Sequence, residues 1–162
     1  MKSPKETIRF NANNVAETLD RLKTLAELKF GASAGRRDFY EYLGEVYRWV
    51  MAWNAANRTN RLRDHIAAKM GREGPRSNAD AFHLVIEATC PKPKQAISKF
   101  AIALSNAERI GVQPQRFETF LAEIGGPTTI YTRKSIFAIT RRVREAKEEK
   151  KARLKKARKR KK

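Results

Sequence analysis

The stretch DFYEYLGEVYRWVMAW, residues 38–53, contains the densest group of aromatic residues in the chain. Its large apolar side chains recur at spacings of three and four residues, which places them on one face of an α-helix. Aromatic side chains bury much apolar area, so this face predicts the central helix of the hydrophobic core. The residues of the face are Phe39, Tyr42, Leu43, Val46, Trp49, Val50 and Trp53.

The same periodicity recurs through most of the chain, and no window alternates convincingly between apolar and polar residues as a strand would. We therefore predict an all-α fold, a compact multi-helix bundle. The first expected helix runs from a cap at Asn13 or Asn14 to residue 31. The second runs from a capping box at Asp38 to a kink or short turn at residues 57–60, beyond which Leu62, Ile66 and Met70 keep the helical period. The others run from a cap at Ser77 or Asn78 to residue 90, from residue 94 to 110, from Pro114 to residue 125, and from residues 133–135 to the C-terminus.

Positive charge is concentrated near the C-terminus. The chain has 162 residues and a formal net charge of +19. Residues 131–162 hold 16 basic and 3 acidic side chains, a net charge of +13, whereas residues 1–130 hold 20 basic and 14 acidic ones, a net charge of +6. A field of this size attracts nucleic acid, an anionic membrane surface or an acidic protein.

Length and composition predict two parts. We expect a helical domain over residues 1–130 and a basic C-terminal helix with its tail over residues 131–162. The linker GREGPRSN, residues 71–78, combines two glycines with a proline and is a candidate hinge. Two subdomains joined there would each have a marginal core, so we expect one composite bundle.

The basic segment is expected to be a long helix that frays into a disordered arm. Glu149 and Arg153 have the favourable acid-first spacing of an ion pair, whereas like-charge repulsion opens the chain from Lys155 onward. Such an arm binds phosphates by counterion release, with little sequence preference. Its candidate phosphate-binding residues are Arg141, Arg142, Arg144, Lys147, Lys150, Lys151, Arg153, Lys155, Lys156, Arg158, Lys159, Arg160, Lys161 and Lys162.

The segment NAERIGVQPQRFETF, residues 106–120, has the spacing of a helix-turn-helix. Ala107 is small enough for a close helix contact, and Gly111 follows at the turn. A plain αα-hairpin needs the same residues, and Phe117 and Phe120 are bulky for the packed corner, so both interpretations stand. In the DNA-reading one, glutamine reads adenine and arginine reads guanine or binds phosphate. The outward-facing candidates are Gln113, Gln115, Arg116 and Thr119.

Two weaker candidates lie in the first half of the chain. On a helix, Arg58, Arg61 and His65 would share a face and form a short basic stripe for phosphate contacts. The alternative is a solvated face with local pairing to an acid. The aromatic stretch would stack bases if it were exposed, but burial in the core is the stronger interpretation, with Tyr40 and Tyr47 lying off the main stripe.

Signatures of catalysis and metal binding are missing from the sequence. It has no glycine-rich phosphate loop, no Gly-x-Ser-x-Gly and no HExxH. Its two histidines, His65 and His83, have no companion carboxylate cluster, which makes a zinc site improbable. The single cysteine, Cys90, is expected to be a buried small apolar residue. We therefore expect a non-enzymatic protein without a metal or cofactor.

These features favour a nucleic-acid-binding protein, with DNA preferred over RNA, that acts as a regulator or accessory factor. One alternative is an RNA-binding or ribosome-associated protein. Another is an adaptor that binds a protein partner or its own copies, with the tail as a localisation signal. An exposed apolar patch among Phe82, Val85, Phe117 and Phe120 would favour the adaptor.

No apolar run is long enough to span a bilayer, and the start of the sequence lacks a secretory signal. In residues 141–162 only Val143 and Leu154 are large and apolar, which is too little for an amphipathic membrane anchor. We therefore expect no membrane insertion and a cytoplasmic, nucleoid-associated location, or a nuclear one in a eukaryotic host.

Overall fold

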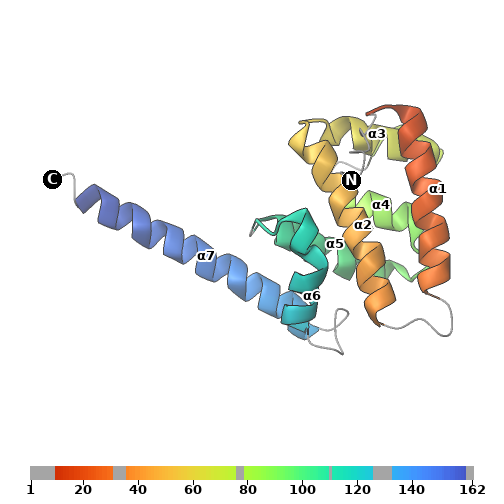
Figure 1. The fold of residues 1–162 in the computed structure, drawn as a ribbon. Helices are drawn as coiled ribbons and strands as arrows, with labels where there is room; N and C mark the ends of the chain where they lie inside the picture. Colours follow the sequence, from red (N-terminus) through yellow and green to blue (C-terminus); the bar gives the residue numbers. More distant parts are fainter. Residues whose placement is uncertain (1–9, 31–35, 76–78, 110, 126–132, 160–162) are drawn as a thin grey trace, which may run out of the picture.

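The computed structural model describes residues 10–30, 36–75, 79–109, 111–125 and 133–159, and all regular structure in these ranges is helical. The predicted all-α fold is confirmed: six helices form a compact bundle, and a long basic helix follows at the C-terminus (Figure 1). The elements are α1 (Ala12–Lys29), α2 (Arg36–Ala55), α3 (Thr59–Lys69), α4 (Ala81–Thr89), α5 (Lys94–Arg109), the 3₁₀ turn η1 (Pro114–Arg116), α6 (Phe117–Gly125) and α7 (Arg133–Lys159).

Helix α2 is the centre of the bundle, as its aromatic face predicts. It contacts α1, α3, α4, η1 and α6. Every residue of the predicted inward face is buried, and Trp53 is 0% exposed. The Trp53 ring makes edge contacts with Trp49 of the same helix and with Phe10, which precedes α1. The interpretation of this stretch as core is therefore confirmed.

Tyr47 joins α2 to two other helices. Its ring stacks on Phe117 of α6, with 4.2 Å between the ring centroids, and on Phe82 of α4 at 5.7 Å. Its hydroxyl donates a hydrogen bond to the Val112 carbonyl oxygen at 2.8 Å. Tyr40 and Tyr47, which lie off the main stripe, are both buried. Neither of them offers a ring on which a base could stack.

Helices α2 and α3 are separated by a turn at Asn57, which confirms the predicted break. Asn57 has a positive φ of 55°, a conformation that asparagine tolerates better than most residues. The Arg58 N–H donates to the Trp53 carbonyl and the Asn57 N–H to the Asn54 carbonyl, at 3.0 and 2.9 Å. These are the two hydrogen bonds of a Schellman motif, so the turn satisfies the free carbonyls at the end of α2.

The predicted starts of α1 and α2 are wrong. The N-cap of α1 is Asn11, whose extended backbone lets its side-chain oxygen accept a hydrogen bond from the Asn14 N–H at 2.8 Å. Asn13 and Asn14 therefore lie inside the helix. Helix α2 begins at Arg36, so Asp38 lies within its first turn and does not precede the helix as a cap would.

The start of α4 is capped by Asp80. Its carboxylate accepts from the His83 N–H at 2.6 Å, and its second oxygen accepts from the Ser105 hydroxyl of α5, also at 2.6 Å. One side chain therefore caps α4 and ties it to α5. The predicted cap at Ser77 or Asn78 is therefore wrong, because the helix begins at Ala81 and Asp80 precedes it. Ser77 and Asn78 themselves lie outside the described residues.

The core continues across the linker at residues 71–78. Helices from before and after the linker contribute to one cluster of buried apolar residues. Arg72, at the start of the linker, makes a two-pronged ion pair with Glu87 of α4, with N–O distances of 3.0 and 3.2 Å. The pair links the chain just after α3 to the following helix.

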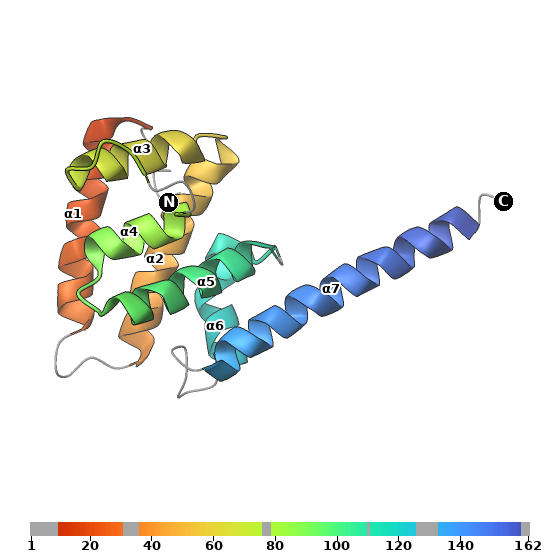
Figure 2. The ribbon, with the colours of Figure 1, turned by 180° about the vertical axis from the view of Figure 1, so that it is seen from behind.

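Helix α7 begins against α5 and α6 and then leaves the bundle, as Figures 1 and 2 show from opposite sides. The predicted long basic C-terminal helix is therefore confirmed. It continues to Lys159, beyond Lys155, where the sequence predicts that the helix opens. The last residues of the predicted arm, 160–162, lie outside the described residues.

Candidate nucleic-acid interface

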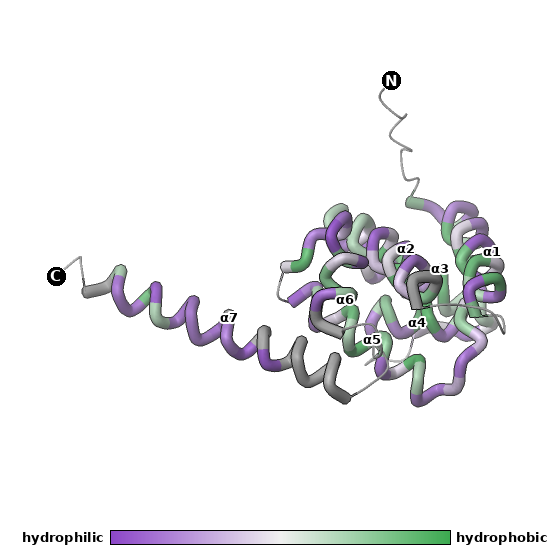
Figure 3. Tube along the Cα trace, turned by 60° about the horizontal axis from the view of Figure 1, so that its bottom comes forward, coloured by the Kyte–Doolittle hydropathy of each residue, from purple (hydrophilic) through white to green (hydrophobic). Residues whose placement is uncertain are grey.

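The described side chains of α7 are surrounded by solvent. Residues 147–157 are all exposed, and they cover about three helical turns. A helix packed against a protein surface would bury a residue at every third or fourth position. Figure 3 shows the same contrast in hydropathy: α7 is almost uniformly hydrophilic over its described length, whereas the helices of the bundle carry hydrophobic stretches.

The exposed part of α7 presents most of the predicted phosphate-binding residues. Arg142, Arg158 and Lys159 lie on the helix, but the structure does not describe their side chains. Residues 160–162 lie outside the described residues. The predicted residues with exposed side chains are Arg141, Arg144, Lys147, Lys150, Lys151, Arg153, Lys155 and Lys156.

Two of these arginines are paired with acids of the same helix. The predicted Glu149–Arg153 pair is present, with an N–O distance of 2.6 Å, and Arg141 lies 3.6 Å from Glu145. All four side chains are more than 60% exposed. Exposed pairs of this spacing contribute only about 0.3–0.5 kcal/mol each, so a phosphate can displace the acid at low cost.

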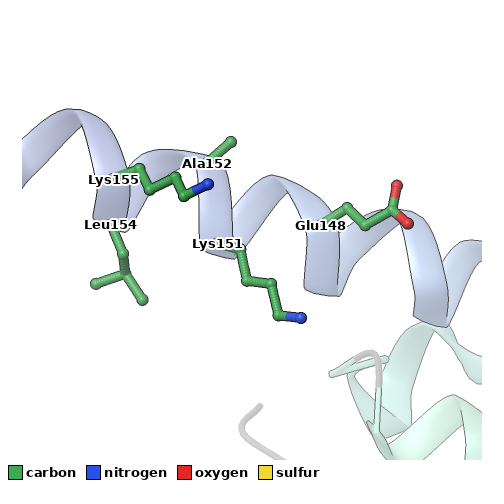
Figure 4. A pocket seen from close by; sticks show the side chains of 5 residues that line it. All are labelled: Glu148, Lys151, Ala152, Leu154 and Lys155. Atoms are coloured by element: carbon green, nitrogen blue, oxygen red, sulfur yellow. The ribbon is translucent and has the colours of Figure 1, made fainter.

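The side chains near the end of α7 spread outward in different directions, as Figure 4 shows. A shallow hollow there is lined by α7 alone, through Glu148, Lys151, Ala152, Leu154 and Lys155. Leu154 is 56% exposed. A hollow with walls from one helix cannot enclose a small molecule, so this surface suits a large partner that surrounds the helix.

The turn after α5 has the geometry that Gly111 predicts. Gly111 has a φ of 77°, in the left-handed region where a side chain would be strained. The Val112 N–H donates to the Ala107 carbonyl at 3.0 Å and the Gly111 N–H to that of Glu108 at 2.9 Å. Ala107 and Phe117 are both fully buried, at the predicted inward positions. A helix-turn-helix and a plain αα-hairpin share these features.

The four candidate base-reading residues after this turn are exposed, but they do not lie on one helix. A 3₁₀ turn replaces the predicted start of a helix at Pro114, and α6 begins only at Phe117. Gln113 precedes the 3₁₀ turn, Gln115 and Arg116 lie in it, and only Thr119 lies in α6.

Helix α6 is held against α2 on its inner side. Glu118 forms an ion pair with Arg48 of α2 at 3.2 Å. Its side chain lies over Gly44, where a Cβ atom would come within 2.5 Å of the Glu118 Oε1 atom. Gly44 therefore lets α6 approach α2 closely. Glu123 is exposed and adds negative charge to the outer side of α6.

The predicted basic stripe on α3 is interrupted, because the turn at Asn57 leaves Arg58 before the helix. Arg58 is the N-cap residue of α3, and its guanidinium lies 5.2 Å from the centre of the Phe10 ring. Arg61 is exposed on α3 itself. His65 is half-buried and makes an edge contact with Trp53. Arg58, Arg61 and His65 therefore do not form one continuous helical face.

A polar cluster that the sequence analysis missed lies between the α2–α3 turn and α5. The Asn54 side-chain amide donates to the Glu108 carboxylate, and the Thr59 hydroxyl donates to the Asn54 side-chain oxygen at 2.5 Å. Burial, and to a lesser extent nearby Asp80, raises the pKa of Glu108. Each polar group in the cluster has a partner, so it joins two segments and offers no free ligand group.

The four residues whose exposure would favour an adaptor do not form a surface patch. Phe82, Val85, Phe117 and Phe120 are all buried, at most 8% exposed. Among the described residues, the large exposed apolar side chains lie on three different helices. They are Leu28, Ile102 and Leu154.

The structure also bears on three other kinds of site: a reactive cysteine, a metal site and a membrane span. Cys90 is buried as expected, and burial raises the pKa of its thiol, which disfavours the reactive thiolate. Within the described ranges no group of three His, Cys, Asp or Glu residues is arranged to hold a metal ion. None of the helices in that part of the chain is both long and apolar enough to cross a membrane.

Comparison with known proteins gave no match: no protein-family model, curated protein or solved structure matches this chain.

Proposed function

We propose that this protein binds nucleic acid without catalysing a reaction, prefers DNA to RNA, and holds the phosphate backbone through α7. In this proposal it acts as a regulator or accessory factor. The observation that carries the proposal is a helix that stands clear of the bundle with eight exposed Lys and Arg side chains. Only three acids accompany them, Glu145, Glu148 and Glu149.

The energetics of this surface support a polyanionic ligand. Basic side chains that neutralise phosphates release condensed counterions, so the affinity falls with salt. Contact with about six phosphates would give a slope near −5 for the logarithm of affinity against the logarithm of salt concentration on duplex DNA. Such binding provides affinity with little choice of sequence.

The polar turn after α5 is a second candidate contact. It leaves the bundle on the same side as α7 in both views (Figures 1 and 2). The exposed residues of this turn, Gln113, Gln115 and Arg116, are therefore candidates to contact a duplex held by α7. We propose that this turn adds contacts that depend on the DNA sequence.

The substitution Arg116→Ala tests the role of the turn. Arg116 is exposed, so its removal should leave the fold intact. A base-reading role predicts a loss of about 1–3 kcal/mol in DNA-binding free energy and weaker discrimination between duplex sequences. An unchanged affinity for every duplex would show that the segment is a plain hairpin.

The nucleic-acid-binding proposal is tested by fluorescence anisotropy of the full-length protein across a salt series. The probes are a mixed-sequence DNA duplex and an RNA of matched sequence. We expect tight binding at low salt, a steep negative slope, and stronger competition by duplex DNA than by the RNA. Failure of duplex DNA to compete would favour the RNA-binding alternative, and no binding to either probe would contradict the proposal.

A further inference from the structure

The charges of α7 are not distributed evenly around its axis. Glu145, Glu148 and Glu149 follow one another at spacings of three and one, which places them within about 100° of the helix circumference. Ala152, seven residues after Glu145, lies on the same side. This side, defined by Glu145, Glu148, Glu149 and Ala152, is the acidic face. Arg141 and Lys156 also lie on it, so its three acids are partly balanced by two basic side chains.

The opposite face of α7 is basic and apolar. Lys147, Lys150 and Leu154 are spaced three and four residues apart, so they share one face. This basic face points roughly 180° away from the acidic face, by the helix period of 3.6 residues. All three side chains are exposed. Leu154 is 56% exposed, and no helix of the bundle lies beside this part of α7 to cover it.

Both flanks between these faces carry basic side chains, but unequally: one carries three, and the other carries Arg153, which is paired with Glu149. Arg144 and Arg153 are nine residues apart, which is about two and a half turns and places them on opposite flanks. Lys151 and Lys155 lie on the flank of Arg144, seven and eleven residues after it. A helix lying across one strand could use only one flank, whereas two basic flanks match a ligand with phosphates on both sides.

We infer that α7 lies in the major groove of B-form DNA, with its basic face toward the base edges and its acidic face toward solvent. This inference rests on the proposed function and adds the geometry of binding. The two basic flanks then meet the two phosphate strands that border the groove. Lysine on the basic face meets guanine acceptors, and Leu154 meets an apolar group such as a thymine methyl.

The dimensions of the helix and the groove agree. An α-helix with its side chains is about 10–12 Å across, and the major groove of B-DNA is about 12 Å wide. Residues 144–157 extend over about 20 Å, a length of duplex that carries about a dozen phosphates on its two strands. The major groove of A-form RNA is deep and narrow, which makes duplex RNA the poorer fit.

Two charge reversals of equal size test which face meets the DNA. Lys150 is on the basic face, whereas Lys156, seven residues after Glu149, is on the acidic face. Both side chains are exposed, and Lys150→Glu and Lys156→Glu change the net charge equally. We expect Lys150→Glu in the full-length protein to weaken binding to a mixed-sequence DNA duplex at least tenfold more than Lys156→Glu does, by anisotropy at fixed low salt.

Equal losses in the two variants would overturn the groove geometry while leaving DNA binding intact. Absence of duplex binding by the unmodified protein would instead contradict the proposed function, so the two failures are distinguishable. A difference between the variants that appears with duplex RNA and not with duplex DNA would also overturn the inference. Circular dichroism checks the helix in both variants, and the pair Lys150→Gln and Lys156→Gln repeats the comparison if a reversal lowers helicity.

A chemical footprint gives an independent reading of the groove. Dimethyl sulfate methylates guanine N7 in the major groove and adenine N3 in the minor groove. With the full-length protein bound to a duplex, we expect protection at guanine N7 and unchanged reaction at adenine N3. Protection at adenine N3 alone would overturn the inference.

Discussion

Helices α2 and α7 are both long, yet they are stabilised in different ways. The inward positions of α2 carry large apolar and aromatic side chains, which are buried by the surrounding helices. Over residues 144–157, α7 has only one large apolar residue, Leu154, and that residue is exposed. Packing stabilises α2, whereas this exposed part of α7 depends on helix propensity and local ion pairs. The side chains along a helix, and not its length, therefore separate a core helix from a solvent-exposed one.

The largest expected effect is the loss of a core side chain from α2. Trp53→Ala removes a fully buried indole that contacts Phe10, Trp49 and His65. We expect the free energy of unfolding to fall by about 3–5 kcal/mol, because a cavity is left in the core. Urea unfolding monitored by circular dichroism measures this change. Leu154→Ala in α7 is the control and should change the value by less than about 0.5 kcal/mol; similar losses in both would contradict the distinction.

The bundle should also lose stability in alkaline solution because of Tyr42. Burial raises the pKa of this phenol above its usual value of about 10, despite an opposing hydrogen bond with Thr89. Above about pH 10 the unfolded chain releases the proton and the native state does not. Stability therefore falls with rising pH, by up to about 1.4 kcal/mol per pH unit from this group.

Unfolding free energies of the full-length protein and the Tyr42→Phe variant, measured from pH 8 to pH 11, check this expectation. The difference between the two proteins should shrink and then reverse above about pH 10, because the variant lacks the ionisable phenol. A constant difference over the whole range would show that the burial of Tyr42 has no consequence for proton release.

At neutral pH the same substitution should have a smaller effect. The Tyr42 hydroxyl lies 2.6 Å from the Thr89 hydroxyl, which also donates to the Val85 carbonyl at 2.8 Å. In Tyr42→Phe, Thr89 keeps its backbone partner, so we expect a loss of about 1 kcal/mol, or about 2–4 °C in Tm. Thr89→Val should cost more, because it leaves the buried tyrosine hydroxyl unpaired. The reverse order would contradict this description of the pair.

The smallest effect is expected for an ion pair on α7. Glu149→Gln removes the pair with Arg153, which should reduce the stability of this helix by about 0.3–0.5 kcal/mol. The unfolding transition of the bundle should not change, whereas affinity for duplex DNA should rise because Arg153 is released and a negative charge is removed. Circular dichroism and anisotropy measure the two effects. Weaker DNA binding would contradict the proposed position of the acidic face.

The periodicity of apolar residues was enough to predict the class of fold and the central role of α2. The cluster of asparagine and threonine residues at 54–60 predicted the break, because short polar side chains compete for backbone hydrogen bonds. Gly111 predicted the turn after α5, because glycine tolerates a positive φ. Helix starts were less predictable. Three asparagines, at positions 11, 13 and 14, lie around the start of α1, and only the conformation of the folded chain selects Asn11 as the cap.

Contacts between distant parts of the chain could not be predicted. The stack of Tyr47 between Phe82 and Phe117 depends on how α2, α4 and α6 pack. The same is true of the contact between Asn54 and Glu108. In the candidate site, the exposed charges of α7 follow from composition alone. The 3₁₀ turn at Pro114 and the placement of Arg58 before α3 depend on local backbone geometry that residue spacing does not specify.

The central claim is that the bundle provides the fold and α7 provides the nucleic-acid contact. The most direct test is anisotropy of a chain ending at Thr140, compared with the full-length protein, on a mixed-sequence DNA duplex across a salt series. We predict that removing residues 141–162 abolishes binding and the steep salt dependence. If the shortened protein retained the affinity and the slope of the full-length chain, the phosphate contacts would lie on the bundle, and the claim would be wrong.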